Sequence, residues 1–244
     1  MAEWLSQIQA DFVLNFIEDD RWKLLLSGLG VTLRITAVAV IIGIVLGSVV
    51  AIIRSTYDKN EEEMQKSRGL KYYLLKILNM ICMLYLTVLR GTPTVVQLMI
   101  TYFVIFASST NAVGIAIFAF GLNSGAYVAE IIRGGIMSTD EGQFEAGRSL
   151  GFSYAQTMIY VTLPQVFKSV LPALCNEFIV LIKETSVAGY VGIADLTKAG
   201  DIIRGRTFSA FMPLLAVAAI YLTIVVILTA LVGKLERRLR RNER

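Results

Sequence analysis

The 244-residue sequence contains no histidine, and only 17% of its residues are charged. The absence of histidine removes the commonest general base, the usual metal ligand and every histidine-dependent catalytic triad. Soluble domains carry about 25% charged residues, whereas this chain is 55% hydrophobic and has a mean hydropathy of +0.64. The composition therefore excludes most hydrolase and metalloenzyme classes and indicates an integral membrane protein.

Cysteine is almost as scarce. Cys82 and Cys175 each lie alone in an apolar run rather than at a metal-binding or redox spacing, so we interpret both as small buried hydrophobic residues. The sequence also lacks a Gly-x-x-x-x-Gly-Lys-Ser/Thr phosphate loop and any nucleic-acid-binding motif. We therefore expect no cofactor, metal or nucleic acid on this chain, and its formal charge of +4 suits anionic lipid headgroups of the bilayer better.

Long apolar runs predict an all-α membrane protein with five transmembrane helices, each of which needs about 20 apolar residues. The five runs are 24–53, 72–106, 113–132, 168–191 and 208–232. The second run is interrupted by Arg90-Gly91-Thr92-Pro93, and because Pro93 removes a backbone donor, we predict one long bent helix there. The polar insert at 55–68 predicts a solvated loop, to which we assign no role.

The basic residues predict the orientation of the spans. Of the 23 basic residues, Arg34, Arg90 and Lys183 are set aside as intramembrane. Fifteen of the others, including Lys76 and Lys168 near span ends, fall on one side and five on the other. Basic residues gather on the cytoplasmic side, so we predict an outside N-terminus, a cytoplasmic C-terminus and a cytoplasmic loop between the third and fourth spans. Residues 1–21 predict an extracytoplasmic, interfacial amphipathic helix, and residues 236–244 predict a cytoplasmic basic tail.

The loop between the third and fourth spans carries a spaced motif. Its residues are Glu145, Ala146, Gly147, Gly151, Leu163 and Pro164. Their order and spacing resemble the EAA loop of permease subunits of binding-protein-dependent ABC importers, which reads Glu-Ala-Ala, three residues, Gly, nine residues, a branched apolar residue, one residue, Leu-Pro. Two positions depart from that pattern, because Gly147 replaces the second alanine and Val161 replaces the usual isoleucine.

The chemistry of this loop independently predicts a short cytoplasmic helix. Asp140 or Thr139 can cap its start, acidic residues suit its N-terminal end, and Gly151 can close it in the left-handed conformation. Pro164 then begins the next element. We therefore expect the loop, at about 137–165, to present a rigid knob that a partner protein can grip.

Three further segments narrow the resemblance. They are 20–36, the Arg90-Gly91-Thr92-Pro93 stretch with Gln97, and 181–186. Together they resemble the polar amino acid permease subfamily over nearly the whole chain from about residue 20. The resemblance implies a five-helix permease domain at 22–235 in a prokaryotic cell membrane. It also implies a second permease copy, identical or a sister chain, and a dimer of cytoplasmic ATPase subunits that bind ATP and Mg. An extracytoplasmic binding protein would deliver the amino acid.

Polar groups inside the spans are candidates for a substrate pathway, because charges there are costly and usually face inward. The candidates are Arg90, Gln97, Asn123, Ser124, Tyr127, Lys183 and Glu184. Arg90 suits a substrate carboxylate or pins the helix bend to neighbouring carbonyls, and Lys183 and Glu184 either line the pathway or form a structural ion pair. We predict a local pair between Glu130 and Arg133. Gly121 and Gly125 predict a loosened point in the third span.

Two other functions fit the sequence less well. An ion-coupled secondary transporter would use the intramembrane acids Glu130, Glu177 or Glu184, but such carriers contain inverted repeats and none is visible between the halves. The hypothesis of a membrane enzyme has less support still, because no nucleophile lies beside a base in the sequence. The Gly43-x-x-x-Gly47 pair in the first span and the Gly121-x-x-x-Gly125 pair in the third both predict close helix packing within the chain, with subunit contact as the lesser option. The transported amino acid stays open.

Overall fold

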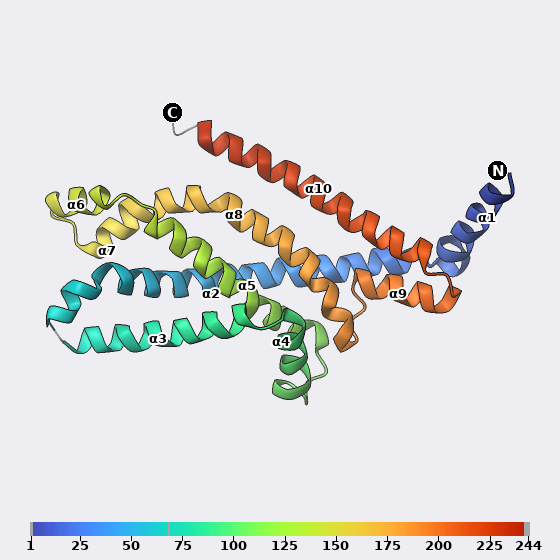
Figure 1. Cartoon of the computed structure of the whole chain (residues 1–244), viewed down its shortest axis with the longest axis horizontal. Helices are drawn as coiled ribbons and strands as arrows, with labels where there is room; N and C mark the ends of the chain where they lie inside the picture. Colours follow the sequence, from blue (N-terminus) through green and yellow to red (C-terminus); the bar gives the residue numbers. More distant parts are fainter. Residues whose placement is uncertain (1, 68, 242–244) are drawn as a thin grey trace. The chain divides into compact units, whose positions relative to one another are not determined.

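The structure is a computed structural model that describes residues 2–67 and 69–241, and these residues form helices and turns with no β-strand among them. In chain order the α-helices are α1 (Ala2–Phe12), α2 (Trp22–Ser67), α3 (Leu70–Gly91), α4 (Thr94–Ile100), α5 (Ala112–Met137), α6 (Glu141–Ser149), α7 (Tyr154–Thr157), α8 (Leu163–Glu184), α9 (Leu196–Thr207) and α10 (Phe211–Arg241) (Figure 1). Short π or 3-10 segments are η1 (Val13–Ile17), η2 (Glu18–Asp20), η3 (Thr101–Ile105), η4 (Met158–Thr162) and η5 (Thr185–Val191). The all-α prediction is confirmed.

The chain forms two compact units, and each is described by itself. Unit 1 comprises Met1–Ala39, Thr94–Phe120 and Phe178–Leu231. Unit 2 comprises Val40–Pro93, Gly121–Glu177 and Val232–Arg244. The spaced motif of the loop between the third and fourth spans therefore lies entirely in unit 2.

Five helical segments are long and apolar enough to cross a membrane, which agrees with the five predicted spans. They are Trp22–Lys59, Leu70–Gly91, Ala112–Met137, Tyr154–Val191 and Phe211–Leu239. Only 6% of the most apolar stretch of the last segment is buried within the chain, the smallest share of the five. Its helix α10 begins at Phe211 with Pro213 in the first turn, where proline costs no hydrogen bond, and continues through Arg241.

The predicted loop at 55–68 is wrong, because α2 continues as one helix through Ser67; residue 68 lies outside the described residues. This stretch contains no glycine or proline and is rich in Glu, Lys, Gln and Met, which favour helix even where they are polar. The Tyr57 hydroxyl donates a 2.9 Å hydrogen bond to Glu61, one turn further along. The charged residues after 53 end the apolar run, but the helix continues through them.

The predicted bent helix at 72–106 is also wrong, because it is two helices. Helix α3 ends at Gly91 and α4 begins at Thr94. Thr92 is extended, with φ −124° and ψ 149°, because the ring of the following Pro93 disfavours the helical region for the residue before it. The helix is therefore interrupted rather than bent, and a π-helical turn, η3, follows α4.

Close packing of α2 on α5 within unit 2 confirms the role predicted for the first glycine pair. A Cβ placed on Gly43 would lie 2.9 Å from the Ser124 hydroxyl, and one on Gly47 would lie 2.6 Å from Val128. Both helices belong to the same chain, so this is packing within the chain. The loosened point predicted near Gly121 is wrong, because α5 is continuous from Ala112 to Met137 and its small residues serve close approach instead.

Unit 1 ties the N-terminal helix to the turn before α10. The side chain of Asn15 is fully buried and donates a 3.2 Å hydrogen bond to the Ser209 hydroxyl, while its carbonyl oxygen accepts a 2.8 Å bond from the Thr207 hydroxyl. Between these two partners, Phe208 adopts a left-handed φ of 54° and is 95% exposed. The helix predicted within residues 1–21 is present as α1.

A second polar contact in unit 1 fixes the start of α9. The buried carboxylate of Asp195 caps this helix by accepting 3.0 Å and 3.1 Å hydrogen bonds from the backbone N–H groups of Thr197 and Lys198. Burial raises the pKa of Asp195, and these two hydrogen bonds act in the opposite direction. Gly28 is required opposite this cap, because a Cβ there would lie 2.7 Å from the Asp195 carbonyl oxygen.

Candidate coupling loop and membrane polar site

The loop between the third and fourth spans forms the predicted short helix, α6. Of the two proposed caps, Asp140 is the one used, since its side chain accepts a 2.7 Å hydrogen bond from the backbone N–H of Gly142. Glu141 in the first turn and Arg148 in the last each match the sign of charge that the helix dipole favours. The helix start was therefore predictable from local chemistry alone.

The end of α6 is the predicted glycine turn. Gly151 has a φ of 81°, and the N–H of Phe152 donates a 3.0 Å hydrogen bond to the carbonyl of Gly147. This six-to-one bond around a left-handed glycine is the Schellman arrangement that satisfies the last carbonyls of a helix. Any side chain at Gly151 would be strained, even though space around its Cβ is open.

The second half of the loop leads into the fourth span. Ser153 and Gln156 form a reciprocal capping box at the start of α7, and the π-helical turn η4 follows. Helix α8 then begins at Leu163, with Pro164 as its second residue, one residue from the predicted start. Figure 1 shows α6 and α7 as the short helices between α5 and α8.

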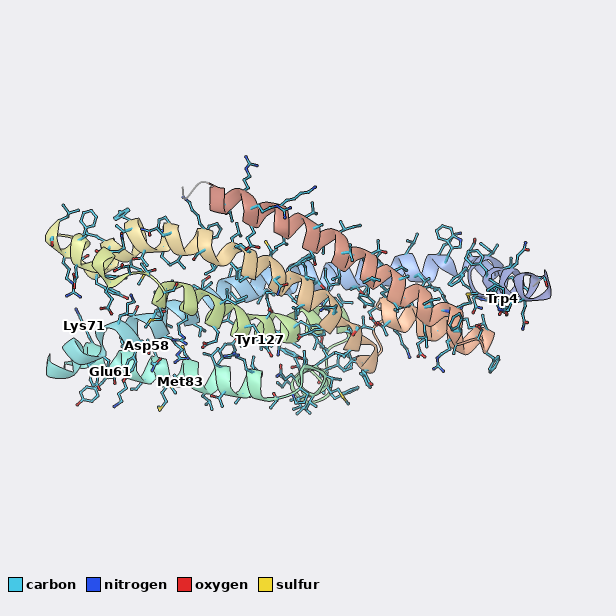
Figure 2. All side chains as sticks on the ribbon, turned by 45° about the horizontal axis from the view of Figure 1, so that its top comes forward. Trp4, Asp58, Glu61, Lys71, Met83 and Tyr127 are labelled. Atoms are coloured by element: carbon cyan, nitrogen blue, oxygen red, sulfur yellow. The ribbon has the colours of Figure 1, made fainter. Side chains whose placement is uncertain are left out.

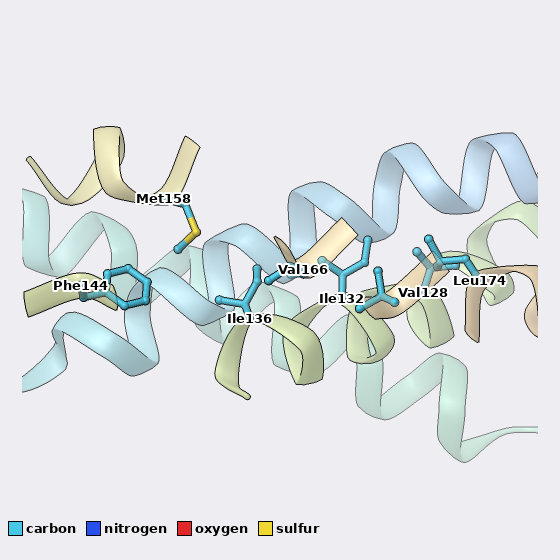
Figure 3. Close-up of a cluster of buried hydrophobic side chains, with 9 residues drawn as sticks. Val128, Ile132, Ile136, Phe144, Met158, Val166 and Leu174 are labelled. Carbon is cyan, nitrogen blue, oxygen red and sulfur yellow. The ribbon is translucent and has the colours of Figure 1, made fainter. Parts of the chain in front are cut away.

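One side of α6 is buried in the hydrophobic core of unit 2. The Phe144 ring stacks on Tyr154 with ring centroids 5.7 Å apart, and it belongs to a buried cluster with Ile136, Met158 and Val166 (Figure 3). Gly147 is also buried on this side, and a Cβ there would lie 2.4 Å from the Thr157 hydroxyl. This contact explains why glycine stands where the EAA pattern has its second alanine.

Replacing Gly147 with alanine is expected to strain the loop by about 1 to 3 kcal/mol, the usual cost of overpacking. The added methyl would collide with the Thr157 side chain, so the double variant Gly147→Ala with Thr157→Ala should recover most of the loss. Thermal unfolding of the purified protein in detergent measures both. Equal destabilisation in the single and double variants would contradict the proposed collision.

The other side of the loop is exposed. Glu145 and Ala146 are exposed, and Leu150 is 76% exposed and Tyr160 70% exposed. The Phe152 and Tyr160 rings lie 6.5 Å apart. The sequence motif singled out Glu145 and Ala146 but not the large apolar residues beside them, because their exposure depends on how the two halves of the loop fold together.

Part of the predicted substrate pathway is brought together in the interior of unit 2. The fully buried Ser124 hydroxyl donates a 3.0 Å hydrogen bond to Glu177, which is also buried. Asn123, 1% exposed, donates a 3.4 Å bond to the carbonyl of Leu89. The Tyr85 hydroxyl donates a 2.6 Å bond to the carbonyl of Leu122; Tyr85 was not among the predicted site residues, because nothing in the sequence marks its partner.

A charge cluster surrounds Glu130 on α5. Its carboxylate lies 3.1 Å from both Arg54 and Arg133 and 3.9 Å from Arg90. The pair predicted with Arg133 is therefore present, with two additional arginines. Arg90 also lies over the ring of Tyr127, 5.6 Å from its centroid; Figure 2 labels Tyr127 on α5.

A cavity of about 230 Å³ opens beside the charge cluster, and Arg54, Thr87, Arg90 and Glu130 are among its lining residues. The side chain of Arg90 is 43% exposed, so a guanidinium group can reach a ligand in this cavity. By contrast, Asn123 and Ser124 are enclosed by their neighbours.

The remaining pathway candidates lie in unit 1. The carbonyl of Gln97 on α4 accepts a 2.7 Å hydrogen bond from the Thr101 hydroxyl. At the end of α8, Lys183 is exposed and Glu184 half-buried. The structure thus groups Arg90, Tyr127 and the Asn123–Ser124 pair in one unit and these three residues in the other.

Comparison with known proteins identifies the family. The family model described as "Binding-protein-dependent transport system inner membrane component" matches residues 69–241, which contain the whole EAA-like loop. The chain belongs to this family. The permease is 36% identical over 223 residues to the "Arginine transport system permease protein ArtQ" of Bacillus subtilis (strain 168), covering 90% of this chain and 94% of that protein.

Two further relatives support the same family assignment. The permease is 40% identical over 169 residues to the "Glutamine transport system permease protein GlnP" of Escherichia coli (strain K12), covering 67% of this chain and 77% of that protein. It is 38% identical to the solved "amino acid ABC transporter with histidines", with a TM-score of 0.77, covering 91% of this chain and 98% of that one. The permease is therefore a transport subunit of the bacterial inner membrane rather than an enzyme, and membership sets aside the ion-coupled carrier.

Proposed function

We propose that this permease carries a polar amino acid into the cell as part of an ATP-driven importer. The observation that carries the proposal is the 38% identity to an amino acid ABC transporter over 91% of the chain. The names of the two permease relatives, for arginine and glutamine transport, support polar amino acids as the substrate class. In this scheme a soluble extracytoplasmic binding protein delivers the amino acid.

The proposed orientation places the N-terminus outside and the loop containing α6 in the cytoplasm. The bias of basic residues supports it, because cytoplasmic loops collect Lys and Arg. Residues 1–21 then form the extracytoplasmic interfacial segment, 22–235 the transmembrane permease domain and 236–244 the cytoplasmic end. The exposed Trp4 on α1 suits a membrane interface, where tryptophan is enriched.

We propose α6 as the coupling helix on which a cytoplasmic ATPase docks. The helix is fixed at both ends and on its buried side, so it can transmit motion as a rigid body. It presents Glu145 and Ala146 outward, and Leu150 and Tyr160 of the same loop are also exposed. ATP and Mg would bind to the ATPase subunits, which close on ATP and rock the helices of a permease dimer, giving alternating access.

For the substrate pathway we propose Arg90 and Tyr127 as the contacts in unit 2, with Arg90 recognising the carboxylate by charge-assisted hydrogen bonds. The place of Arg90 in the lining of the cavity at Glu130 supports this assignment, and Tyr127 lies under the Arg90 guanidinium. Asn123 and Ser124 line the buried side of the same unit, and Gln97, Lys183 and Glu184 are the candidates in unit 1.

The coupling proposal is tested with Gly151→Asp. The substitution places a β-carbon residue at a φ of 81° and should deform the knob, so we expect at least about tenfold less ATPase to co-purify in mild detergent, or transport to be lost with the ATPase retained. Gly69→Asp is the matched control, because Gly69 precedes α3 in open space and has no left-handed φ.

Mass spectrometry of the captured proteins and uptake of labelled arginine and glutamine by the native host read out the result. Normal ATPase capture together with normal uptake in Gly151→Asp would overturn docking at α6. Uptake of neither labelled amino acid by wild-type cells, with a wider amino acid panel equally negative, would overturn the substrate class.

A further inference from the structure

The polar extension of α2, residues 55–67, contacts the coupling loop, although no role for it is evident from its residues alone. Helix α2 runs for 46 residues to Ser67, about 69 Å at the usual helical rise and more than twice the thickness of a bilayer core. Two consecutive residues near the end of its spanning segment, Asp58 and Lys59, make contacts in opposite directions within unit 2.

Asp58 joins the extension to the charge cluster on α5. Its carboxylate lies 3.3 Å from Arg133, and Arg133 lies 3.1 Å from Glu130. Glu130 in turn pairs with Arg54, one turn before Asp58 on α2. Two ion pairs therefore connect α2 to α5 at successive turns, and Asp58 (Figure 2) is the outermost member.

Lys59 joins the same extension to the coupling helix. Its ammonium group lies 4.0 Å from the centroid of the Phe144 ring, a geometry that gives a cation–π attraction. The same ring stacks on Tyr154 of α7. Lys59 thus contacts the aromatic pair that holds α6 against α7.

Beside this contact lies a cleft of about 480 Å³. Its lining includes Asp58, Lys59, Glu141, Glu145 and Arg148. Glu145 is the glutamate of the EAA-like motif, so the extension and the motif share one cleft. The extension contacts the motif helix at Phe144.

We propose that Asp58 and Lys59 form a brace that sets the coupling helix against α2 and α5, so that motion imposed on α6 reaches the helices of the permease. The inference rests on the proposed docking of the ATPase at α6. The brace acts by position: neither residue contacts substrate or nucleotide. Without it, α6 remains folded and capped but is no longer held to α2 by charge.

The brace makes a specific prediction about coupling. In Lys59→Met, the side chain keeps its apolar length and loses the charge that the aromatic face attracts. We expect ATPase capture to stay at the wild-type level while uptake of labelled arginine and glutamine falls about fivefold, the factor that corresponds to loss of a moderate cation–π contact. Asp58→Asn should likewise keep wild-type ATPase capture while its uptake of the labelled amino acids falls.

Conservative variants distinguish the brace from simple structural support. Lys59→Arg keeps a cation over the ring and Asp58→Glu keeps the carboxylate, so both should retain near-normal uptake. Lys71→Met is the control for the change itself, because Lys71 is exposed at the start of α3. All variants replace the chromosomal copy in the native host and are compared at equal permease amount by immunoblot, with ATPase capture measured in parallel.

Normal uptake in Lys59→Met and Asp58→Asn would overturn the brace. Loss of the ATPase from these variants would also overturn it, because the contact would then serve assembly with the ATPase instead of transmission of motion to the permease helices. The docking proposal fails separately, through normal ATPase capture and uptake in Gly151→Asp. A defective Gly151→Asp beside a normal Lys59→Met leaves docking in place and removes the brace.

Discussion

Replacing Glu130 with glutamine is expected to unfold or severely destabilise the permease. Glu130 is the carboxylate shared by Arg54, Arg133 and Arg90, and arginine stays charged in proteins. Glutamine keeps the size of the side chain but removes the negative charge, leaving guanidinium groups facing an amide inside a membrane span. Breaking a fully buried ion pair by removing one partner costs about 3 to 5 kcal/mol. Because the Glu130 side chain is 22% exposed, we expect a loss at the lower end of this range, about 3 kcal/mol.

Thermal unfolding in detergent, together with the yield of monodisperse protein, measures this loss. Glu141→Gln is the matched control, because Glu141 is exposed in the first turn of α6 and its charge contributes at most about 1 kcal/mol through the helix dipole. A Glu130→Gln protein as stable as the Glu141→Gln protein would show that the three arginines do not depend on this carboxylate.

Replacing Gly47 with leucine is expected to prevent α2 from packing on α5. A Cβ at Gly47 would already lie 2.6 Å from the Val128 side chain and 2.8 Å from the backbone nitrogen of Ala129. Backbone cannot move aside as a flexible side chain can, so the helices must separate, which we expect to cost about 3 kcal/mol or more. Size-exclusion chromatography of the membrane extract should show loss of the monodisperse peak.

The same helix provides the control for this substitution. Gly30 lies in α2 and has no atom within 4 Å of its Cβ position, so Gly30→Leu makes the same chemical change without a collision. A monodisperse Gly47→Leu protein, comparable in yield to Gly30→Leu, would mean that α2 and α5 do not pack at this glycine.

The elements that the sequence predicts well are those decided by neighbouring residues. The start of α6 at Asp140 and its end at Gly151 depend on side chains and dihedral angles within a few positions, so both were predictable. The spans depend on local apolar content, and all five are present. The glycine pair at Gly43 and Gly47 was predictable because only a close neighbour requires two glycines one turn apart.

Three predictions of where a helix ends, bends or loosens are wrong. The insert at 55–68 is polar but composed of good helix formers, and the pair of glycines in α5 leaves that helix continuous. In the second span the cost of Pro93 was underestimated, because the restriction on Thr92 before it turned a bend into a break. Hydropathy reports the environment of a residue and not its backbone conformation, which explains the error at 55–68. The errors in α5 and at Pro93 came from misjudging how glycine and proline act on a helix.

The contacts that sequence could not predict join residues far apart in the chain. Glu130 was paired with Arg133, three residues away, but Arg54 lies 76 positions from it. The contact between Lys59 and Phe144 likewise requires knowing which face of α2 meets the coupling loop. In each case the sequence contains residues that can pair, but it does not show that the fold brings them within contact distance.

The continuity of α2 between Gly47 and Asp58 makes the number of residues in this interval a structural constraint of its own. Gly47 fixes one end of the interval against Val128, and Asp58 fixes the other against Arg133. Deleting one residue would rotate everything beyond it by about 100° and shorten the helix by about 1.5 Å, while deleting seven would restore the facing to within about 20°. The interval therefore resists a change of length, in addition to the constraint that packing places on its buried side chains Val50, Ala51 and Ser55.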